Sequence, residues 1–315
     1  MQTMQAVRIH EYGGPEVLRY ESAPGPQPGA GEALLRVHAA GVNPIDWKVR
    51  AGLFQRVMPH QLPLILGWDV SATVVELPSS AGGLAVGDEV YARLEVARDG
   101  AYAELVAAPV ETLAKKPDSL DHVHAAAVPI AGLTAWQALF EPAAAGLRKG
   151  ETILIHGAAG GVGTFAVQLA KWSGAHVIAT SSGHNAAFLR ELGADAVIDY
   201  GKQRFEEVTP KVDAVLDTVG GDTQARSFSV IKPGGVLVSI VGPPRADEAQ
   251  RRGVRAAAMV ARNDLGVLAE ITRLLQDHVI RPIVAEVLPL AEARRAHQLS
   301  QGGHVRGKIV LRVAG

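Results

Sequence analysis

The chain has 315 residues, 48 % of them apolar, and its 31 basic and 32 acidic residues leave a net charge of −1. This balance argues against nucleic acid or an acidic membrane as the main partner, because both require a basic surface. The sequence contains no cysteine, which excludes disulfides, thiolate metal sites and cysteine nucleophiles. The composition predicts a globular protein of about two domains.

Two stretches bear on location. The N-terminal segment MQTMQAVRIHEYGG lacks the apolar core of a signal peptide. The most apolar stretch, residues 125–136, is interrupted by Pro129 and Gly132 and is shorter than the roughly 18 residues that a membrane span needs. We therefore expect a cytoplasmic protein without a membrane partner.

The first part of the chain alternates short apolar runs with glycine and proline, as in VSATVVELPSSAGGLAVGDEVYARL and GAYAELVAA. This spacing predicts a compact, barrel-like β domain. Residues 136–139 are predicted to be a helix that leads into the next domain. The pair His122 and His124 is expected in a polar loop before a helix.

From Glu151 onward the pattern alternates between strand and helix. The stripe formed by Val162, Phe165, Ala166, Leu169 and Ala170 has helical spacing and predicts a helix over 161–173. A parallel sheet covered on both faces is expected. The tail predicts a helix that ends near Gly302 and Gly303, then a strand over 308–313. The strands of the sheet are predicted at 152–156, 177–180, 196–199, 213–218, 236–241 and 254–260.

The segment HGAAGGVGTF lies between the first of these strands and the first helix. The leading N–H groups of a helix lack partners and attract phosphate. Gly160 lets the backbone approach a diphosphate, and Gly163 lets the helix pack closely on the strand. The strict G-x-G-x-x-G pattern fails, because alanine replaces the first glycine. The alternative is a tight turn that binds no ligand.

The end of the second strand bears on the choice of dinucleotide. It reads ATSSGHN and contains no carboxylate to bind a ribose hydroxyl. Thr180, Ser181 and the following serine leave room for a 2′-phosphate, which favours NADP, although the nearest cation in sequence is Arg190. The serines can equally form an ordinary polar loop.

A resemblance to a known family is carried by nine stretches spread along the chain: GVNPIDWKVRAG, LGWDVSATVVE, VGDEVYA, GAYAELV, AAAVPIAGLTAWQAL, HGAAGGVGTFAVQLAK, LGADAVIDY, DAVLDTVGG and RGKIVL. In these stretches the chain resembles the zinc-independent medium-chain dehydrogenases/reductases of the quinone oxidoreductase (zeta-crystallin-like) branch. The resemblance implies a GroES-like catalytic domain (1–130, completed by 265–315), a Rossmann domain (131–264) and an NADPH cleft between them.

The zinc alcohol dehydrogenases of the wider superfamily bind their metal in part through Gly-His-Glu, where this chain has Gly67-Trp68-Asp69. No metal site is therefore expected, because zinc needs three or four well-placed ligands. Without a Lewis acid, we expect reduction of an electron-poor acceptor, either a quinone or the C=C bond of an α,β-unsaturated carbonyl.

The resemblance supplies candidate residues for this chemistry, and each has a plainer alternative. Asn43 and Thr134 are predicted to face the nicotinamide. The alternatives are that Asn43 forms an Asn-Pro turn and that Thr134 lies at the start of a helix. Lys48 stands where quinone reductases often have tyrosine, and either stabilises an enolate or is a solvated surface lysine. Phe54 and Trp68 are predicted to line the substrate, or else to fill the core.

Further residues are predicted to bind the cofactor. In the family, Tyr200 contacts the 2′-phosphate, while Val219 and Val241 follow strands whose carboxyl ends face ligands. Lys308 either reaches the cofactor or lies exposed at the surface. The predicted set comprises Asn43, Thr134, Ala159, Gly160, Gly161, Val162, Thr180, Ser181, Tyr200, Val219, Val241 and Lys308.

Three functions stay open: an NADPH-dependent quinone or enone reductase, a reductase of enoyl thioesters, and a non-catalytic NADPH-binding protein. The segment GVRAAAMVA resembles the family's last Rossmann strand, which pairs across a two-fold axis. The resemblance therefore implies a homodimer.

Overall fold

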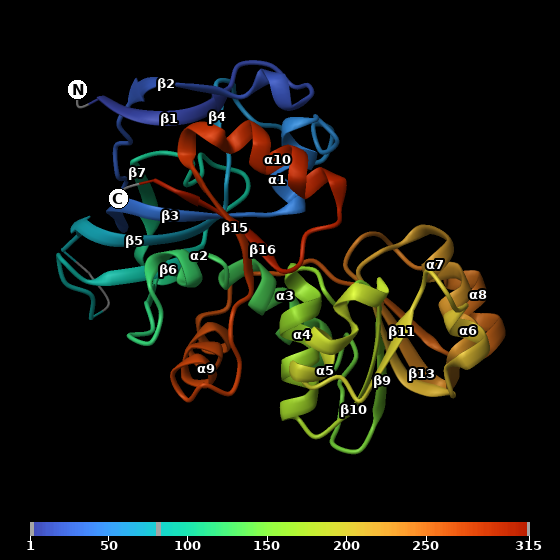
Figure 1. Ribbon diagram of the computed structural model, residues 1–315. Coiled ribbons are helices and arrows are strands. Elements are labelled where there is room, and N and C mark those ends of the chain that lie inside the picture. The colour runs from blue at the N-terminus through green and yellow to red at the C-terminus, as the bar shows by residue number, and fades with distance from the viewer. Residues whose placement is uncertain (1–2, 80–82, 314–315) are drawn as a thin grey trace. The chain divides into compact units, whose positions relative to one another are not determined.

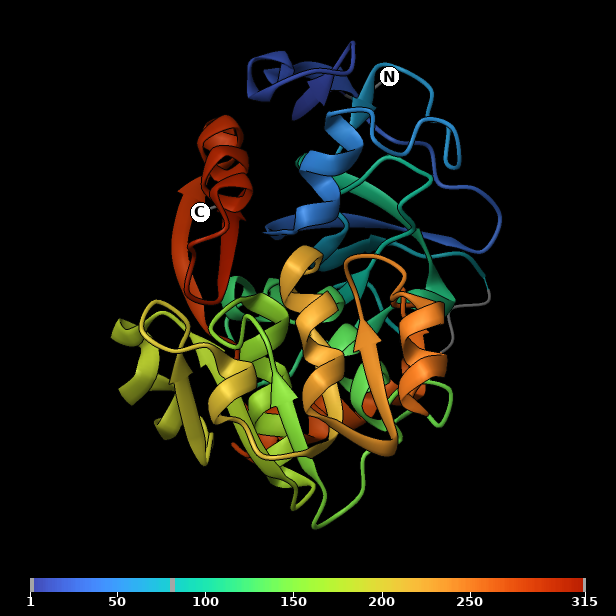
Figure 2. The same ribbon diagram turned by 90° about the vertical axis from the view of Figure 1, so that its right-hand side faces the viewer.

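The computed structural model describes residues 3–79 and 83–313 and divides the chain into two compact units (Figures 1 and 2). Unit 1 comprises Met1–Ile130, Asn263–Asp277 and Pro282–Gly315. Unit 2 comprises Ala131–Arg262 and His278–Arg281.

Unit 1 is built on two sheets. The larger one has the order β15-β16-β3-β5-β6-β8, with β7 pairing with β3, and its pairs are antiparallel except for β15 with β16. The smaller sheet has the order β2-β1-β4. The strands are β1 (Thr3–Ile9), β2 (Arg19–Pro24), β3 (Glu32–Val42), β4 (Leu64–Ile65), β5 (Asp69–Glu76), β6 (Glu89–Arg93), β7 (Leu105–Pro109), β8 (Ala114–Lys115), β15 (Val284–Pro289) and β16 (Lys308–Arg312).

The core of unit 1 lies on these sheets. Most residues of β3 and β5 are buried, because neighbouring elements cover both faces of these central strands. Trp68 and Tyr102 are among the largest side chains that are fully buried. The helices are α1 (Pro44–Arg50), α2 (His122–Ala126), α9 (Leu265–Gln276) and α10 (Ala293–Gly302), with 3-10 turns η1 (Pro15–Val17), η2 (Val110–Thr112) and η5 (Leu290–Glu292).

Unit 2 contains a parallel six-stranded sheet of order β11-β10-β9-β12-β13-β14. The chain runs outward from β9 through β10 to β11 and then returns to the other side of β9 as β12. This reversal is the switch point where open α/β sheets bind ligands beyond the strand carboxyl ends. The strands are β9 (Thr152–Ile155), β10 (His176–Ser181), β11 (Ala196–Asp199), β12 (Val212–Asp217), β13 (Ile231–Ser239) and β14 (Arg255–Ala258).

Helices pack along this sheet, as Figure 1 shows for α4 beside β9 and β10. Helix α5 packs on β11, α7 on β12 and β13, and α8 on β14. The helical elements are α3 (Pro129–Phe140), α4 (Gly161–Trp172), α5 (Ala186–Glu191), α6 (Phe205–Val208), α7 (Gly221–Ser227), α8 (Ala246–Arg252), η3 (Gly183–Asn185) and η4 (Phe228–Val230).

The predicted alternation of strand and helix in unit 2 is confirmed, and most observed boundaries lie within two residues of the predicted ones. Two differences stand out. Helix α3 begins at Pro129, seven residues before the predicted start, so Thr134 lies inside it. The prediction that His122 and His124 lie in a loop is wrong: both belong to α2, which Asp121 caps by accepting a hydrogen bond from the His124 N–H at 2.8 Å.

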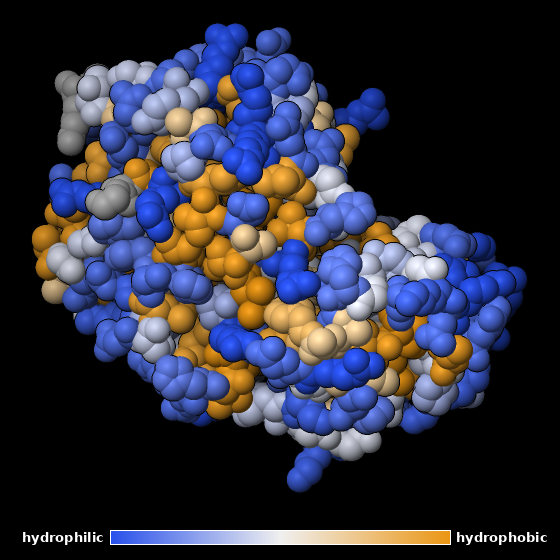
Figure 3. Space-filling model, viewed as in Figure 1, coloured by the Kyte–Doolittle hydropathy of each residue, from blue (hydrophilic) through white to orange (hydrophobic). Residues whose placement is uncertain are grey.

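The surface over α6 and α8 is mainly hydrophilic (Figure 3). The arginines of α8 are matched there by carboxylates: Arg251 pairs with Asp247 and Glu248, and Arg252 pairs with Glu248. This face therefore carries mixed charge rather than a basic stripe.

None of the helices within residues 3–79 and 83–313 combines the length and the apolar character needed to cross a bilayer.

Candidate functional site

The segment that joins β9 to α4, residues 157–163, is called the glycine turn here. Gly157 has φ of 61°, in the left-handed region that favours glycine. Gly160 is the N-cap of α4 and has φ of −78° and ψ of 177°, extended backbone that any residue adopts. The turn lies at the carboxyl end of the central strand β9, at the switch point of the sheet.

The glycines of this turn differ in what surrounds them. A Cβ on Gly163 would lie 2.6 Å from Ala158 Cα and closer still to the carbonyl oxygen of Gly157. A Cβ on Gly160 would meet only the Gly157 oxygen, at 3.3 Å. Gly163 is thus required for packing within the turn, whereas Gly160 leaves a site that the protein itself does not fill.

The N-terminus of α4 presents hydrogen-bond donors at this site. Thr164 donates its N–H to the Gly160 carbonyl at 2.9 Å, the first such bond back into the helix. The N–H groups of Gly161, Val162 and Gly163 occupy the leading positions, which have no intrahelical acceptor. Aligned donors at a helix N-terminus suit an anion such as a diphosphate.

The adjacent strand ends are fixed by Asp217, the fully buried last residue of β12. Its carboxylate accepts the N–H groups of Val219 and Gly220 at 3.0 and 2.8 Å, and the hydroxyl of Ser239 from β13 at 2.9 Å. Val219 and Val241, the predicted cofactor contacts after β12 and β13, remain exposed. Sequence reasoning missed Asp217, although an aspartate that ends a buried strand before glycines is a recognisable signal.

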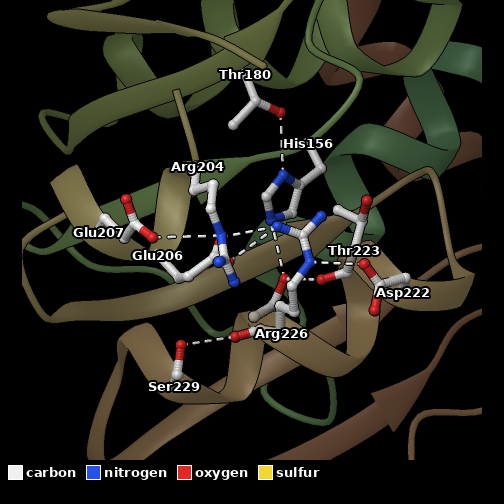
Figure 4. A network of polar contacts seen from close by, with 10 residues as sticks. His156, Thr180, Arg204, Glu206, Glu207, Asp222, Thr223, Arg226 and Ser229 are labelled. Carbon is white, nitrogen blue, oxygen red and sulfur yellow. Dashed lines mark hydrogen bonds and ion pairs between the residues drawn. The ribbon is translucent and has the colours of Figure 1, made fainter. Parts of the chain in front are cut away.

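His156, directly after β9, forms hydrogen bonds with one residue of β10 and one of α7 (Figure 4). Its Nε2 lies 2.9 Å from Ser227 Oγ, and its Nδ1 lies 3.0 Å from Thr180 Oγ1. Since Ser227 donates its own proton to the Thr223 carbonyl at 2.6 Å, Nε2 must be the donor to Ser227. Nδ1 is then the acceptor, and the Thr180 hydroxyl is engaged with His156.

Burial lowers the pKa of His156 to about 4, so its ring is neutral at pH 7. The unfolded chain binds this proton near the ordinary pKa of 6.5, whereas the folded chain does not until about pH 4. Stability is therefore lost as pH falls through this window, by about 3 kcal/mol in all. His156→Gln should remove that loss.

The measurement is urea denaturation at pH 7 and pH 4.5. The wild type should lose about 2–3 kcal/mol more than His156→Gln between the two pH values. His304→Gln, at an exposed position, is the control and should behave as the wild type does. Equal losses in all three proteins would contradict the assignment of the acid sensitivity to His156.

The segment that ends the second strand, β10, has no carboxylate of its own, but Asp199 of the neighbouring strand places one beside it. Asp199 is the last residue of β11 and pairs in register with Ser181. A Cβ on Gly183, in the turn η3 after β10, would lie 3.0 Å from Asp199 Cγ. Sequence reasoning missed this residue because a neighbouring strand supplies it, although carboxyl ends of parallel strands meet at one edge. Ser181 is buried, and Tyr200 is exposed.

In unit 1, Asn43, Asp69 and Lys308 form a buried polar cluster. The Lys308 ammonium donates to Asp69 Oδ2 at 3.1 Å and to the amide oxygen of Asn43. Asn43 Nδ2 donates to Asp69 Oδ2 at 2.8 Å. Lys308 is 4 % exposed and Asp69 0 %, so the alternative that Lys308 is a surface lysine is wrong. Both ends of the Asn43 amide are occupied.

A second polar group adjoins this cluster through α1, which Asn43 caps. Asp46 Oδ2 accepts the Asn43 N–H and the Tyr102 hydroxyl, each at 2.8 Å. His297 Nδ1 lies 3.2 Å from Arg50 Nη1. Burial raises the pKa of Asp46 to about 7, and burial lowers the pKa of His297 to about 3.

The remaining predicted residues are placed as follows. The ammonium of Lys48, in α1, lies 5.7 Å from the centre of the Trp47 ring, and the side chain is half-buried. Phe54 is partly buried against the core of unit 1. Trp68 is fully buried, with its indole N–H donated to the Arg98 carbonyl at 3.0 Å. In unit 2, Thr134 is buried in α3.

Comparison with known proteins assigns both units to described families. Residues 29–118 match the alcohol dehydrogenase GroES-like domain, and residues 192–311 match a family described as zinc-binding dehydrogenase. Together with the switch-point sheet of unit 2, these matches confirm both parts of the predicted fold class.

Three similar proteins each align with 98 % of this chain. The chloroplast envelope quinone oxidoreductase homolog of Arabidopsis thaliana is 34 % identical, over 98 % of its own length. The mitochondrial NAD(P)H oxidoreductase RTN4IP1 of Danio rerio is 32 % identical over 91 % of its length. The 2-methylene-furan-3-one reductase of Solanum lycopersicum is 34 % identical over 79 %.

Two solved structures have the same fold over nearly the whole chain. The quinone oxidoreductase from Coxiella burnetii superposes with a TM-score of 0.91 at 36 % identity, covering 99 % of this chain and 100 % of the other. The mycobacterial protein Rv1454c, solved in complex with NADPH, gives a TM-score of 0.86 at 32 % identity, covering 98 % and 100 %.

The zinc in one of these family descriptions does not fit the side chains of this chain. Within residues 3–79 and 83–313, no three His, Asp or Glu residues are grouped so that they could bind a metal ion. In Gly67-Trp68-Asp69 the tryptophan is a core residue, and the aspartate is paired with Lys308. We therefore derive no step through zinc.

Proposed function

Because the chain belongs to the quinone oxidoreductase family of medium-chain dehydrogenases/reductases, we propose that it reduces a quinone or an α,β-unsaturated carbonyl with NADPH. Family membership makes the chain an NAD(P)H-dependent oxidoreductase. The preference for NADPH and the class of acceptor are our proposal.

The observation that carries the proposal is the glycine turn at the switch point of unit 2. The amides of Gly161 and Val162 would hold the diphosphate, and Gly160 would let it approach. A Cβ on Gly160 would meet little of the protein, which fits a position kept open for a ligand. Ala159, buried beside it, would complete the contact.

The adenosine end of the cofactor is assigned to the carboxyl ends of β10 and β11. Ser181 and the exposed Tyr200 lie there, joined by the Tyr200 N–H donating to the Ser181 carbonyl at 3.2 Å. The choice of NADPH is supported by the hydroxyl-rich segment after β10 and by the NADPH complex of the similar mycobacterial protein.

The acceptor is inferred from the chemistry that the side chains allow. When bound, the reduced nicotinamide supplies a hydride, and a solvent proton completes the two-electron reduction of a quinone or an enone C=C bond. Lys48 would stabilise the negative charge that develops on the acceptor oxygen, and Phe54 would supply an apolar wall. Asn43 and Thr134 stay predicted contacts of the nicotinamide.

Trp68 has less support as a substrate-lining residue. Its ring is fully buried in the core of unit 1, and its one donor is satisfied by the Arg98 carbonyl. We keep Phe54, which is only partly buried, as the better candidate.

The test follows NADPH absorbance with 1,2-naphthoquinone, a simple enone and an enoyl thioester. Oxidation of NADPH by the quinone or the enone is the expected result. Oxidation by the enoyl thioester alone would favour the thioester reductase. Binding of NADPH without oxidation by any of the three would overturn the proposal in favour of a binding protein.

The homodimer and the cytoplasmic location remain predictions. Strand β14 ends the sheet of unit 2 and pairs with β13 on one side, which leaves an edge of the kind that can pair with a second copy. Two of the similar proteins are named for the chloroplast envelope and the mitochondrion.

A further inference from the structure

The carboxylate of Asp199, the last residue of β11, packs against the segment that follows β10. Its Cγ lies 3.0 Å from the position that a Cβ of Gly183 would take, and its Oδ2 lies closer still. Gly183 has no side chain there, so the carboxylate rests directly against the turn η3. A larger residue at position 183 would have to displace Asp199.

The position of the carboxylate is fixed by the backbone. Oδ1 accepts the N–H of Gly201 at 3.0 Å, and the register of β10 with β11 sets Asp199 opposite Ser181. The side chain is 22 % exposed, and Lys202, which is mostly exposed, approaches its Oδ2 only to 4.0 Å. An exposed lysine at that distance compensates little of the negative charge.

In dinucleotide-binding sheets, the adenosine ribose lies at the end of the second strand, which is β10 here. A carboxylate there accepts a hydrogen bond from a 2′-hydroxyl and repels a 2′-phosphate. The usual acid belongs to the second strand itself, whereas Asp199 reaches the same place from the third. Its effect on nucleotide choice should nevertheless be the same.

We infer that Asp199 is a specificity-determining residue that lowers the preference of this chain for NADPH over NADH, so that both cofactors are used. The inference rests on the proposed dinucleotide site. A segment with serines that admit a 2′-phosphate would then also accept a cofactor without one. Removing the charge should therefore raise the preference for NADPH.

The test compares wild type with Asp199→Asn, which keeps an oxygen for the Gly201 N–H. Isothermal titration with 2′,5′-ADP and with 5′-AMP measures binding independently of turnover. In the variant, the affinity for 2′,5′-ADP relative to that for 5′-AMP should rise about tenfold. The ratio of kcat/KM for NADPH to that for NADH should rise by the same factor, and the change should lie in KM rather than in kcat.

Asp195→Asn is the matched control. Asp195 precedes β11 at the opposite edge of the sheet, has a similar exposure of 25 % and pairs with Lys171 at 2.6 Å. This variant should keep the wild-type ratios. Asp199→Ser, which also removes the charge, should reproduce the effect if Asp199→Asn does not fold.

The outcomes separate this inference from the proposed function. Wild-type binding of both nucleotides with unchanged ratios in the Asp199 variants would overturn the inference and leave the proposed function standing. An equal rise in Asp195→Asn would also overturn it. Failure of wild type to bind either nucleotide would overturn both.

Discussion

Gly160→Val is expected to weaken NADPH binding by roughly a hundredfold or more while the protein stays folded. The valine side chain would occupy the space in front of the leading amides of α4. The extended backbone at residue 160 accepts any side chain, and a Cβ there meets only the Gly157 oxygen at 3.3 Å. Because valine is a poorer N-cap than glycine, stability should fall by about 1 kcal/mol at most.

Calorimetric titration with NADPH and thermal unfolding together check this prediction. Gly163→Ala is the contrasting variant, because its Cβ would lie 2.6 Å from Ala158 Cα. That variant should lose several kcal/mol of stability, about the cost of overpacking a rigid backbone contact. Wild-type affinity in Gly160→Val would mean that the diphosphate does not bind at the glycine turn.

Lys308→Met is expected to reduce the free energy of unfolding by about 3–5 kcal/mol. The substitution removes the ammonium and leaves the carboxylate of Asp69, which is 0 % exposed, without its counter-charge. The remaining donors to that carboxylate are Asn43 Nδ2 at 2.8 Å and the Ile130 N–H at 2.7 Å. Uncompensated charge in the core is costly because the low-dielectric interior screens it poorly.

Urea denaturation measures this loss, with an exposed pair as the control. Lys232 pairs with Asp213 at 2.8 Å, at side-chain exposures of 44 % and 28 %. Lys232→Met should therefore cost less than about 1 kcal/mol. The double variant Lys308→Met/Asp69→Asn should lose less free energy of unfolding than the sum of the losses in the two single variants. A loss in Lys308→Met no larger than in the control would contradict the assigned burial of the pair.

Much of unit 2 was predictable because its signals are local. The apolar stripe that begins at Val162 has helical spacing, and the β-branched runs between helices are typical of buried parallel strands. The glycine turn stands between the two, so its place at the end of β9 followed directly. The helices α1 and α9 also have local signals that were not used, since Asn43 and Asp264 cap them.

The features that sequence reasoning missed depend on partners far apart in the chain. Lys308 lies 239 residues from Asp69, and nothing near either residue indicates that they form a buried pair. Asp199 reaches the end of β10 only through the register of two strands. For Trp68, the sequence left open whether the ring lines a substrate or fills the core, and its burial follows from the packing of unit 1.

A crystal structure of the complex with NADPH tests the central claim most directly. The account predicts that the diphosphate oxygens accept hydrogen bonds from the N–H groups of Gly161 and Val162, with Gly160 beneath them. A diphosphate bound elsewhere on the chain, with the glycine turn left open, would contradict it.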